Sequence, residues 1–139
     1  MKIVARHPNF KLPTRGSTGA GGYDIYMPER GRLVSDVEEK IMLGFSAKVP
    51  EGWAALLMPR SGWGGRGLEL MNTTGLIDSD YTGEWIAKVR DKTGRGMQWE
   101  AGERVLQYIL VPAGLFDPVL VDSLDETERG EGGFGSTDK

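Results

Sequence analysis

Residues 75–84, which read GLIDSDYTGE, carry the side chains best suited to acid–base chemistry. Two short apolar segments flank a turn rich in Asp, Ser and Gly, a pattern that predicts a β-hairpin with Asp78, Asp80 and Tyr81 at its mouth. Asp78 directly follows Leu76 and Ile77, so partial desolvation there would suit a carboxylate that takes a proton from water. In the alternative interpretation, both aspartates only shape the turn by hydrogen bonding to the backbone.

Pro59, Arg60, Ser61 and Gly62 end an apolar run and have the composition of an anion-binding loop. In a glycine-rich turn, backbone N–H groups can point at an anion, while a guanidinium forks onto it and a hydroxyl donates a further hydrogen bond. Phosphate is the anion that fits such a loop. Taken alone, the same four residues also suit an ordinary turn.

Two further segments offer polar groups beside predicted strands. Asp24 follows the small residues 20–22 and Tyr23, where it could orient water on a Mg²⁺ ion or simply end a turn. Arg104 and Gln107 place a cation and an amide three residues apart, which does not match the two-residue period of a strand face. We therefore expect one of the two to lie where the strand begins.

Residues 129–137, which read RGEGGFGST, contain four glycines and a single large apolar side chain, Phe134. This segment cannot bury enough surface to order itself. It is either a frayed terminus or an arm that orders on a ligand. In the second interpretation, backbone amides and the hydroxyls of Ser136 and Thr137 meet phosphate oxygens while Phe134 stacks.

The elements that must position these residues are predicted to be β-strands. The 139 residues suit one domain, and 21 glycines and 7 prolines leave no uninterrupted stretch longer than 12 residues. Residues 84–90 alternate in the manner of a half-buried strand, and residues 104–111 are nearly all apolar, as in a strand buried on both faces. Residues 119–121 fit a last strand. The sequence therefore predicts a compact all-β barrel or sandwich, with residues 91–96 as a loop remote from the site.

Composition excludes several classes of site. The chain has no cysteine and one histidine, His7, which excludes disulfides, thiolate zinc sites and multi-histidine metal clusters. Its net charge of −3 is not accompanied by a basic stripe, so no nucleic-acid polymer is expected as a partner. No apolar run approaches the ~20 residues that cross a bilayer, and the first residues do not resemble a signal peptide. We expect a cytoplasmic protein without a membrane partner.

Taken in order, these segments resemble the five motifs of the homotrimeric deoxyuridine triphosphate nucleotidohydrolases, the dUTPases. The matching segments span nearly the whole chain: residues 20–24, 59–62, 75–84, 104–107 and 129–137. The resemblance implies a jelly-roll-like β fold and a homotrimer whose active sites are shared between subunits. It also implies Mg²⁺-dependent hydrolysis of dUTP to dUMP and pyrophosphate, which removes dUTP and supplies dUMP for thymidylate synthesis.

The resemblance assigns Asp78 as the general base that activates water for attack at the α-phosphorus, and Tyr81 as the ring packed against the deoxyribose. Uracil would be bound by the backbone around Leu76, Ile77 and Asp78 and by the pocket residues Asn72 and Ile86. The phosphates would be bound by Arg60, Ser61, Gly62 and Gln107 of a neighbouring subunit, with Asp24 reaching Mg²⁺ through water. Arg104 fits a structural cation. The closing arm would contribute Arg129, Phe134, Gly135, Ser136 and Thr137.

This resemblance divides the chain into a β-barrel domain over residues 1–128 and a flexible arm over residues 129–139. The glycine-rich segment 63–67 departs from the more helical continuation common in the family. Two alternative functions remain at this stage. One is a dCTP deaminase of the same broad fold, and the other is a nucleotide-sensing regulatory or interaction protein that retains the site.

Overall fold

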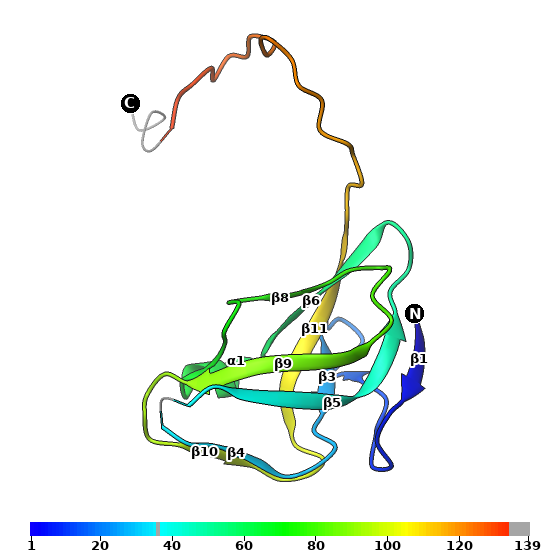
Figure 1. Ribbon diagram of the computed structural model, residues 1–139, viewed down its shortest axis with the longest axis vertical. Helices are drawn as coiled ribbons and strands as arrows, with labels where there is room; N and C mark the ends of the chain where they lie inside the picture. The colour runs from blue at the N-terminus through cyan, green and yellow to red at the C-terminus, as the bar shows by residue number, and fades with distance from the viewer. Residues whose placement is uncertain (36, 134–139) are drawn as a thin grey trace.

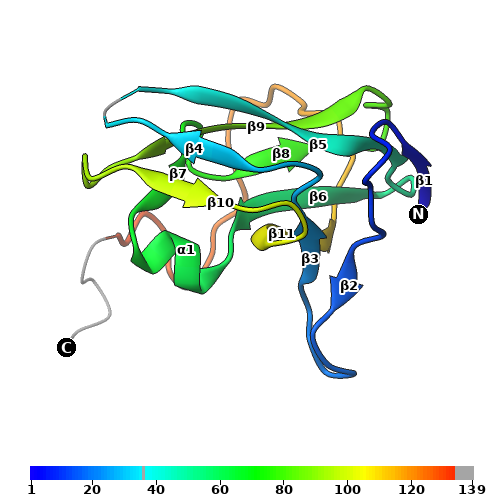
Figure 2. The same cartoon turned by 90° about the horizontal axis from the view of Figure 1, so that it is seen from below.

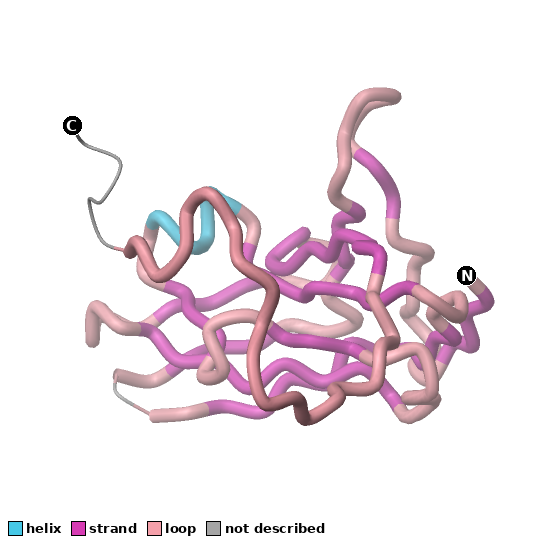
Figure 3. The backbone as a smooth tube through the Cα atoms, turned by 90° about the horizontal axis from the view of Figure 1, so that it is seen from above, coloured by secondary structure: helices cyan, strands magenta, loops and turns pink. Residues whose placement is uncertain are grey.

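Glycine and proline divide the chain into short extended segments, and most of these segments form strands. The computed structural model describes residues 1–35 and 37–133. In chain order the elements are β1 (Lys2–Ala5), β2 (Thr14–Arg15), β3 (Tyr23–Tyr26), β4 (Gly31–Leu33), β5 (Glu39–Lys48), β6 (Trp53–Pro59), α1 (Ser61–Gly65), β7 (Leu68–Leu70), β8 (Gly75–Ile77), β9 (Glu84–Asp91), β10 (Met97–Trp99) and β11 (Arg104–Pro112). Strands dominate the described chain, and α1 is its single helix (Figures 1 and 3).

The strands form two facing layers. One sheet has the order β1-β5-β9-β7, the second has the order β2-β3-β11-β6-β8, and β10 pairs with β4 in a separate ribbon. All of these pairs are antiparallel. Figure 2 shows β5 and β9 in one layer and β6 and β11 in the other. The all-β prediction is confirmed.

Aromatic rings fill the space between the two sheets. Trp85 of β9 meets Tyr108 of β11 edge-on, with ring centroids 5.1 Å apart, and Phe45 of β5 lies 5.0 Å from Trp85. All three side chains are almost fully buried, and rings in such arrangements contribute about 0.5–1.5 kcal/mol per pair beyond the burial of their area. The predicted strand over residues 84–90 is confirmed as β9, with Trp85 and two alternate neighbours facing this core.

The predicted hairpin over residues 75–84 is wrong. β8 pairs with β6 in one sheet, whereas β9 pairs with β5 and β7 in the other, so the intervening turn carries the chain between layers. The backbone N–H of Tyr81 donates to the Asp78 carbonyl at 3.2 Å. The Tyr81 hydroxyl donates to the Glu84 carbonyl at 2.8 Å. Tyr81 therefore ties together both ends of this connection.

The end of the chain differs from expectation in two ways. β11 lies between β3 and β6, but its later residues 109–111 are only partly buried, so it is covered on both faces only in its first half. Residues 119–121 form no strand: Val119 is 79% and Leu120 100% exposed, because no strand edge of the described chain pairs with them. Residues 113–133 instead run away from the two sheets (Figure 1).

Asp91, at the end of β9, is a fully buried carboxylate that organises the turn after the strand. Its Oδ1 accepts hydrogen bonds from the Thr93 hydroxyl at 2.7 Å and the Thr93 N–H at 2.8 Å. Its Oδ2 accepts from the Gly96 N–H at 2.8 Å. The hydrogen bond from the Thr93 hydroxyl is the main cause that holds the pKa of Asp91 below its ordinary value of 3.8, against the opposing effect of burial.

This lowered pKa predicts how stability responds to acid. The Asp91 carboxylate stabilises the fold fully above its unfolded-state pKa, and that contribution is lost as the pH falls through the lower folded-state pKa. We therefore expect the native chain to be more stable than Asp91→Asn at pH 6, with the difference shrinking from pH 4 toward pH 2. Thermal unfolding of both proteins across this range measures it. A difference that stays constant with pH would contradict the prediction.

Candidate functional site

Three polar side chains from distant segments meet at one end of the second sheet. Asp24 on β3 is 5% exposed, and its Oδ1 lies 2.7 Å from Nε of Arg60. Its Oδ2 lies 3.1 Å from Nη1 of Arg104. Arg60 also donates through Nη1 to the Arg104 carbonyl at 3.2 Å. Two guanidinium groups share one carboxylate and both stay partly exposed, so the cluster carries local positive charge that suits an anion.

Gln107 joins this cluster because β11 is irregular where it begins. Arg104 pairs with Tyr26 and Leu106 with Ile25, a register shift that marks a β-bulge against β3. Gln107 then lies directly opposite Asp24, and its Nε2 donates to the Pro59 carbonyl at 3.3 Å. The bulge explains the three-residue spacing of Arg104 and Gln107. It adds one residue to the strand, so the side chains beyond it point to the opposite face from the one expected in a regular strand. One of the two was expected where the strand begins, and that residue is Arg104.

The segment after Arg60 is a short helix and not a turn. α1 contains Ser61 and Gly62, both exposed, and includes three glycines among its five residues. Trp63 anchors it: the side chain is 7% exposed and meets Trp99 edge-on at 6.3 Å. The Arg66 guanidinium lies over the Trp63 ring, 3.8 Å from its centroid. The glycine-rich segment 63–67 is therefore partly helical and is held by tertiary contacts.

An apolar hollow of about 350 Å³ lies beside β6, β7, β8 and β9. Asn72 and Ile86, both predicted to form the base pocket, line it together with Leu57, Leu70, Met71, Gly75, Ala87 and Lys88. The turn before β8 is tight, because Thr73 has a φ of 64° and the Thr74 N–H donates to the Asn72 carbonyl at 2.6 Å. The structure thus brings one polar side-chain amide to a mostly apolar recess.

Asp78 and the cluster around Asp24 do not meet within one chain. Asp78 is exposed, so the desolvation expected from its apolar neighbours is not provided by this chain alone. The β6–β8 register pairs Ala55 with Ile77, which places Asp78 across from Ala54, while Arg60 follows the far end of β6. At ~3.3 Å per residue, the two positions are about 20 Å apart along the strand.

The remaining predicted site residues lie at the surface or outside the described chain. Leu76 is 60% and Tyr81 41% exposed, whereas Ile77 is 8% exposed. Arg129 donates through Nε to the Gly132 carbonyl at 2.8 Å. The predicted contacts of Phe134, Gly135, Ser136 and Thr137 lie outside the described residues. Over residues 1–35 and 37–133, no cluster of three or more His, Asp or Glu side chains could hold a metal, and both oxygens of Asp24 are ion-paired.

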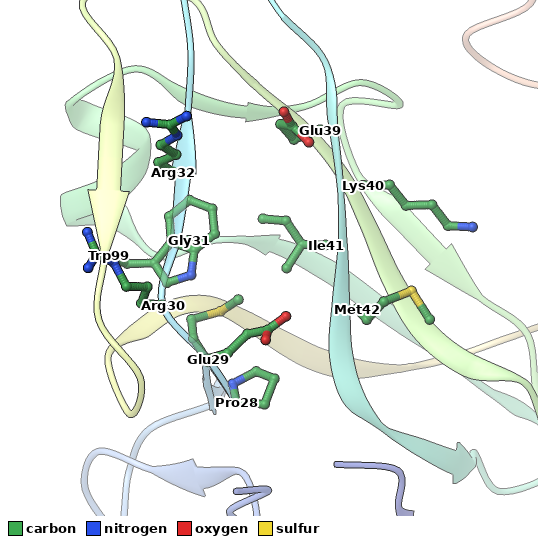
Figure 4. A pocket seen from close by; sticks show the side chains of 11 residues that line it. Pro28, Glu29, Arg30, Gly31, Arg32, Glu39, Lys40, Ile41, Met42 and Trp99 are labelled. Atoms are coloured by element: carbon green, nitrogen blue, oxygen red, sulfur yellow. The ribbon is translucent and has the colours of Figure 1, made fainter.

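A second hollow, of about 170 Å³, lies between β4 and β5, away from these residues (Figure 4). Ile41 points from β5 toward the Trp99 ring, and Lys40 points away. Trp99 lies directly over Gly31, where an added Cβ would come within 2.2 Å of the indole. This hollow contains none of the predicted site residues.

Sequence reasoning missed the contact between the turn after β9 and the segment that follows α1. The Lys92 N–H donates to the Gly67 carbonyl at 3.0 Å, so the loop that was expected to be remote contacts the residue two positions after α1. The available signal was local: an aspartate two residues before a threonine is typical of a turn organised by its side chain. The neighbouring residues in the sequence did not indicate that this turn contacts Gly67.

Comparison with known proteins finds relatives that match nearly the whole chain. A family profile described as dUTPase matches residues 8–138. Deoxyuridine 5'-triphosphate nucleotidohydrolase of Wolinella succinogenes is 33% identical over 140 residues, which cover 100% of this chain and 94% of the relative. The protein of the same name from Bdellovibrio bacteriovorus is 39% identical over 129 residues, which cover 91% of this chain and 87% of that relative.

Solved structures agree in fold. The dUTPase of Staphylococcus bacteriophage 80alpha, determined with dUPNHPP, has a TM-score of 0.86 and 25% identity over 97% of this chain and 96% of its own. A mutant dUTPase from phage phi11 of S. aureus, described with a structural Mg(II) ion, has a TM-score of 0.79 and 21% identity over 88% and 96% of the two chains. The shared architecture is jelly-roll-like. No helix in the described part is long and apolar enough to cross a membrane. From the extent of the profile match and these identities, the chain belongs to the dUTPase family.

Proposed function

We propose that this chain hydrolyses dUTP to dUMP and pyrophosphate at a site assembled from several copies of itself. Membership of the dUTPase family supports the activity and the class of dUTP diphosphatase. The observation that carries the proposed arrangement is the separation of about 20 Å along β6 between Arg60 and the position facing Asp78. One nucleotide cannot place its α-phosphorus beside Asp78 and its outer phosphates on Arg60 of the same chain.

The exposed apolar residues after β11 also favour an assembly. Leu115, Phe116, Leu120 and Leu124 are 72–100% exposed within residues 113–133. So many exposed large apolar side chains in one segment are unusual in a monomer, and exposed apolar surface of this amount marks a contact with another molecule. A second copy of the chain would bury this surface, and closed rotational symmetry would give every copy the same contact. The homotrimer implied by the family resemblance satisfies both requirements.

The proposed mechanism uses Asp78 as a general base. Its carboxylate would take a proton from the water that attacks the α-phosphorus, while a neighbouring copy supplies phosphate contacts through Arg60, Ser61, Gly62 and Gln107. Tyr81, held at the turn by its hydrogen bond to the Glu84 carbonyl, would pack on the deoxyribose. A ring tight against that sugar excludes a 2′-hydroxyl and so rejects ribonucleotides.

The apolar recess near Asn72 and Ile86 suits a pyrimidine ring. Its lining offers the Asn72 amide for a polar edge, and the backbone of Leu76, Ile77 and Asp78 lies on the adjoining strand end. A narrow recess would discriminate against the 5-methyl group of thymine. The arm would complete the site with Arg129 and Ser136/Thr137 on the outer phosphates and Phe134, next to Gly135, over the base. Its closure would exclude bulk water and strengthen the charge interactions inside.

The residues of this cluster fit a Mg²⁺ ion whose ligands come mainly from the phosphate oxygens of the substrate. Asp24 is neutralised by Arg60 and Arg104, so the described cluster lacks the several free carboxylates that hold a bare divalent ion. Asp24 would reach the ion through water. When bound with the triphosphate, Mg²⁺ would offset negative charge on the phosphate oxygens.

The test is pyrophosphate release from dUTP, compared with dATP, dGTP, dCTP and dTTP at equal concentration. We expect turnover of dUTP well above that of dTTP. Comparable turnover of dTTP, or none of dUTP, would overturn the proposal. Ammonia release from dCTP would instead identify a deaminase. Nucleotide binding without turnover would identify a binding protein that acts as a regulator.

A shared site makes a second prediction, which concerns mixtures of inactive variants. Asp78→Asn and Arg60→Ala are each expected to be nearly inactive alone, but co-expression should restore activity, because a mixed assembly can pair a native Asp78 with a native Arg60. Random assembly at equal amounts would give about a quarter of the native sites. Co-expression of Asp78→Asn with Gln107→Ala is a matched second pair. Failure of both mixtures to exceed the single variants would show that each site belongs to one chain.

A further inference from the structure

The segment that carries Arg60 and Ser61 has little intrinsic ability to hold its own shape. α1 begins at Ser61 without a side-chain cap hydrogen bond among the described residues, and three of its five residues are glycine. Glycine destabilises helices because it loses the most backbone entropy on ordering. The position of this segment must therefore be set by what it contacts. Trp63 provides one such contact against Trp99.

A second contact runs along the backbone from the turn after β9. The Lys92 N–H donates to the Gly67 carbonyl at 3.0 Å. The Gly67 N–H donates to the Gly64 carbonyl at 3.0 Å, and the Gly64 N–H donates to the Arg60 carbonyl at 2.9 Å. Three consecutive hydrogen bonds thus connect the turn at Asp91 to Arg60, whose guanidinium is ion-paired with Asp24.

The fit between this turn and Gly67 leaves no spare room. Gly67 has a φ of +111°, and a Cβ added there would lie 2.4 Å from Cγ2 of Thr93 and 3.1 Å from Oδ1 of Asp91. Thr93 is itself fixed by its two hydrogen bonds to Asp91, and Gly96 is fixed by a third. The buried carboxylate therefore sets the shape of the surface on which Gly67 rests.

We propose that Asp91 and Thr93 are positioning residues for the phosphate-binding segment Arg60-Ser61-Gly62. By holding Gly67, they fix the end of α1 and the approach of Arg60 and Ser61 to the phosphate chain. The base recess near Asn72 and Ile86 does not include either residue. Their loss should weaken binding of the outer phosphates while recognition of the uracil nucleoside is retained. This inference rests on the proposed function, since it assigns Arg60 and Ser61 to phosphate.

The test compares two ligands that share the base but differ in phosphate length. Binding of dUMP and of the nonhydrolysable triphosphate analogue dUpNHpp is measured by calorimetry, well below the melting temperature of each variant. We expect Asp91→Asn and Thr93→Val to weaken dUpNHpp binding about tenfold, because each removes hydrogen bonds to a charged, buried carboxylate. Binding of dUMP should stay within about twofold of native. The KM for dUTP should rise in parallel.

Two controls give the experiment its specificity. Thr93→Ser keeps the hydroxyl that bonds Asp91 and should fall between native and Thr93→Val. Lys92→Ala keeps the backbone N–H that bonds Gly67 while it changes an exposed side chain, so it should behave as native. If the native chain hydrolyses dUTP but both main variants bind dUMP and dUpNHpp with equal losses, or with none, the positioning role is refuted. If the native chain does not hydrolyse dUTP, the proposed function is refuted, and the positioning role that rests on it is refuted as well.

Discussion

Replacement of Asp78 by asparagine is expected to lower the turnover of dUTP by about 10³-fold, within the range that a general base contributes. The amide has nearly the same shape but cannot accept a proton from the attacking water. Binding of dUpNHpp should stay close to native, because the phosphate contacts proposed for Arg60, Ser61 and Gln107 do not involve this side chain. Single-turnover rates and calorimetric affinities measure the two effects separately.

Asp80 offers a matched control for this substitution. It lies two residues away in the same turn and is exposed, as Asp78 is. Asp80→Asn should therefore retain most of the activity if the chemistry depends on position 78, and lose it if the turn simply needs negative charge. Equal losses of affinity and rate in Asp78→Asn would show that Asp78 shapes the turn, which is the alternative that the sequence leaves open.

Removal of residues 129–139 is expected to lower kcat/KM by about 10²-fold, because an arm that closes over the nucleotide excludes water and completes the phosphate contacts. The melting temperature should change by less than about 2 °C, since exposed terminal segments contribute little to a core. Arg129, the first residue removed, bonds only to Gly132 among the described residues, so its loss leaves the sheets intact.

A shorter truncation distinguishes the loss of the predicted motif residues from the mere shortening of the chain. Removal of residues 138–139 alone leaves the whole predicted motif of residues 129–137 in place and should leave kcat/KM near native. A large fall in melting temperature after removal of 129–139 would identify the arm as a structural strap. Unchanged kcat/KM after the longer truncation would exclude a role in closing the site.

Strand β9 shows what a sequence pattern can predict. Its alternation of apolar and polar residues predicts a strand with one buried face, and Trp85 lies in the core as expected. The turn before it was predicted correctly as a turn but wrongly as a hairpin. Turn residues fix the local bend, whereas the partner of each flanking strand is decided by distant segments such as β5 and β6.

The cluster around Asp24 shows why the geometry of the site could not be predicted locally. Arg104 is 80 residues from Asp24 in the sequence, and the two meet because β3 and β11 are neighbours across a bulge. The same holds for the Asp91 turn, whose sequence indicates a turn but not its contact with Gly67. The family resemblance suggested the candidate residues, and the sheet register determines which of them meet in one chain.

Hydrolysis of dUTP in water enriched in ¹⁸O tests the central claim most directly. If water activated near Asp78 attacks the α-phosphorus, mass spectrometry will find one ¹⁸O atom in dUMP and none in the pyrophosphate after a single turnover. Label in the pyrophosphate would place the attack at the β-phosphorus and contradict the account. So would the formation of dUDP and inorganic phosphate.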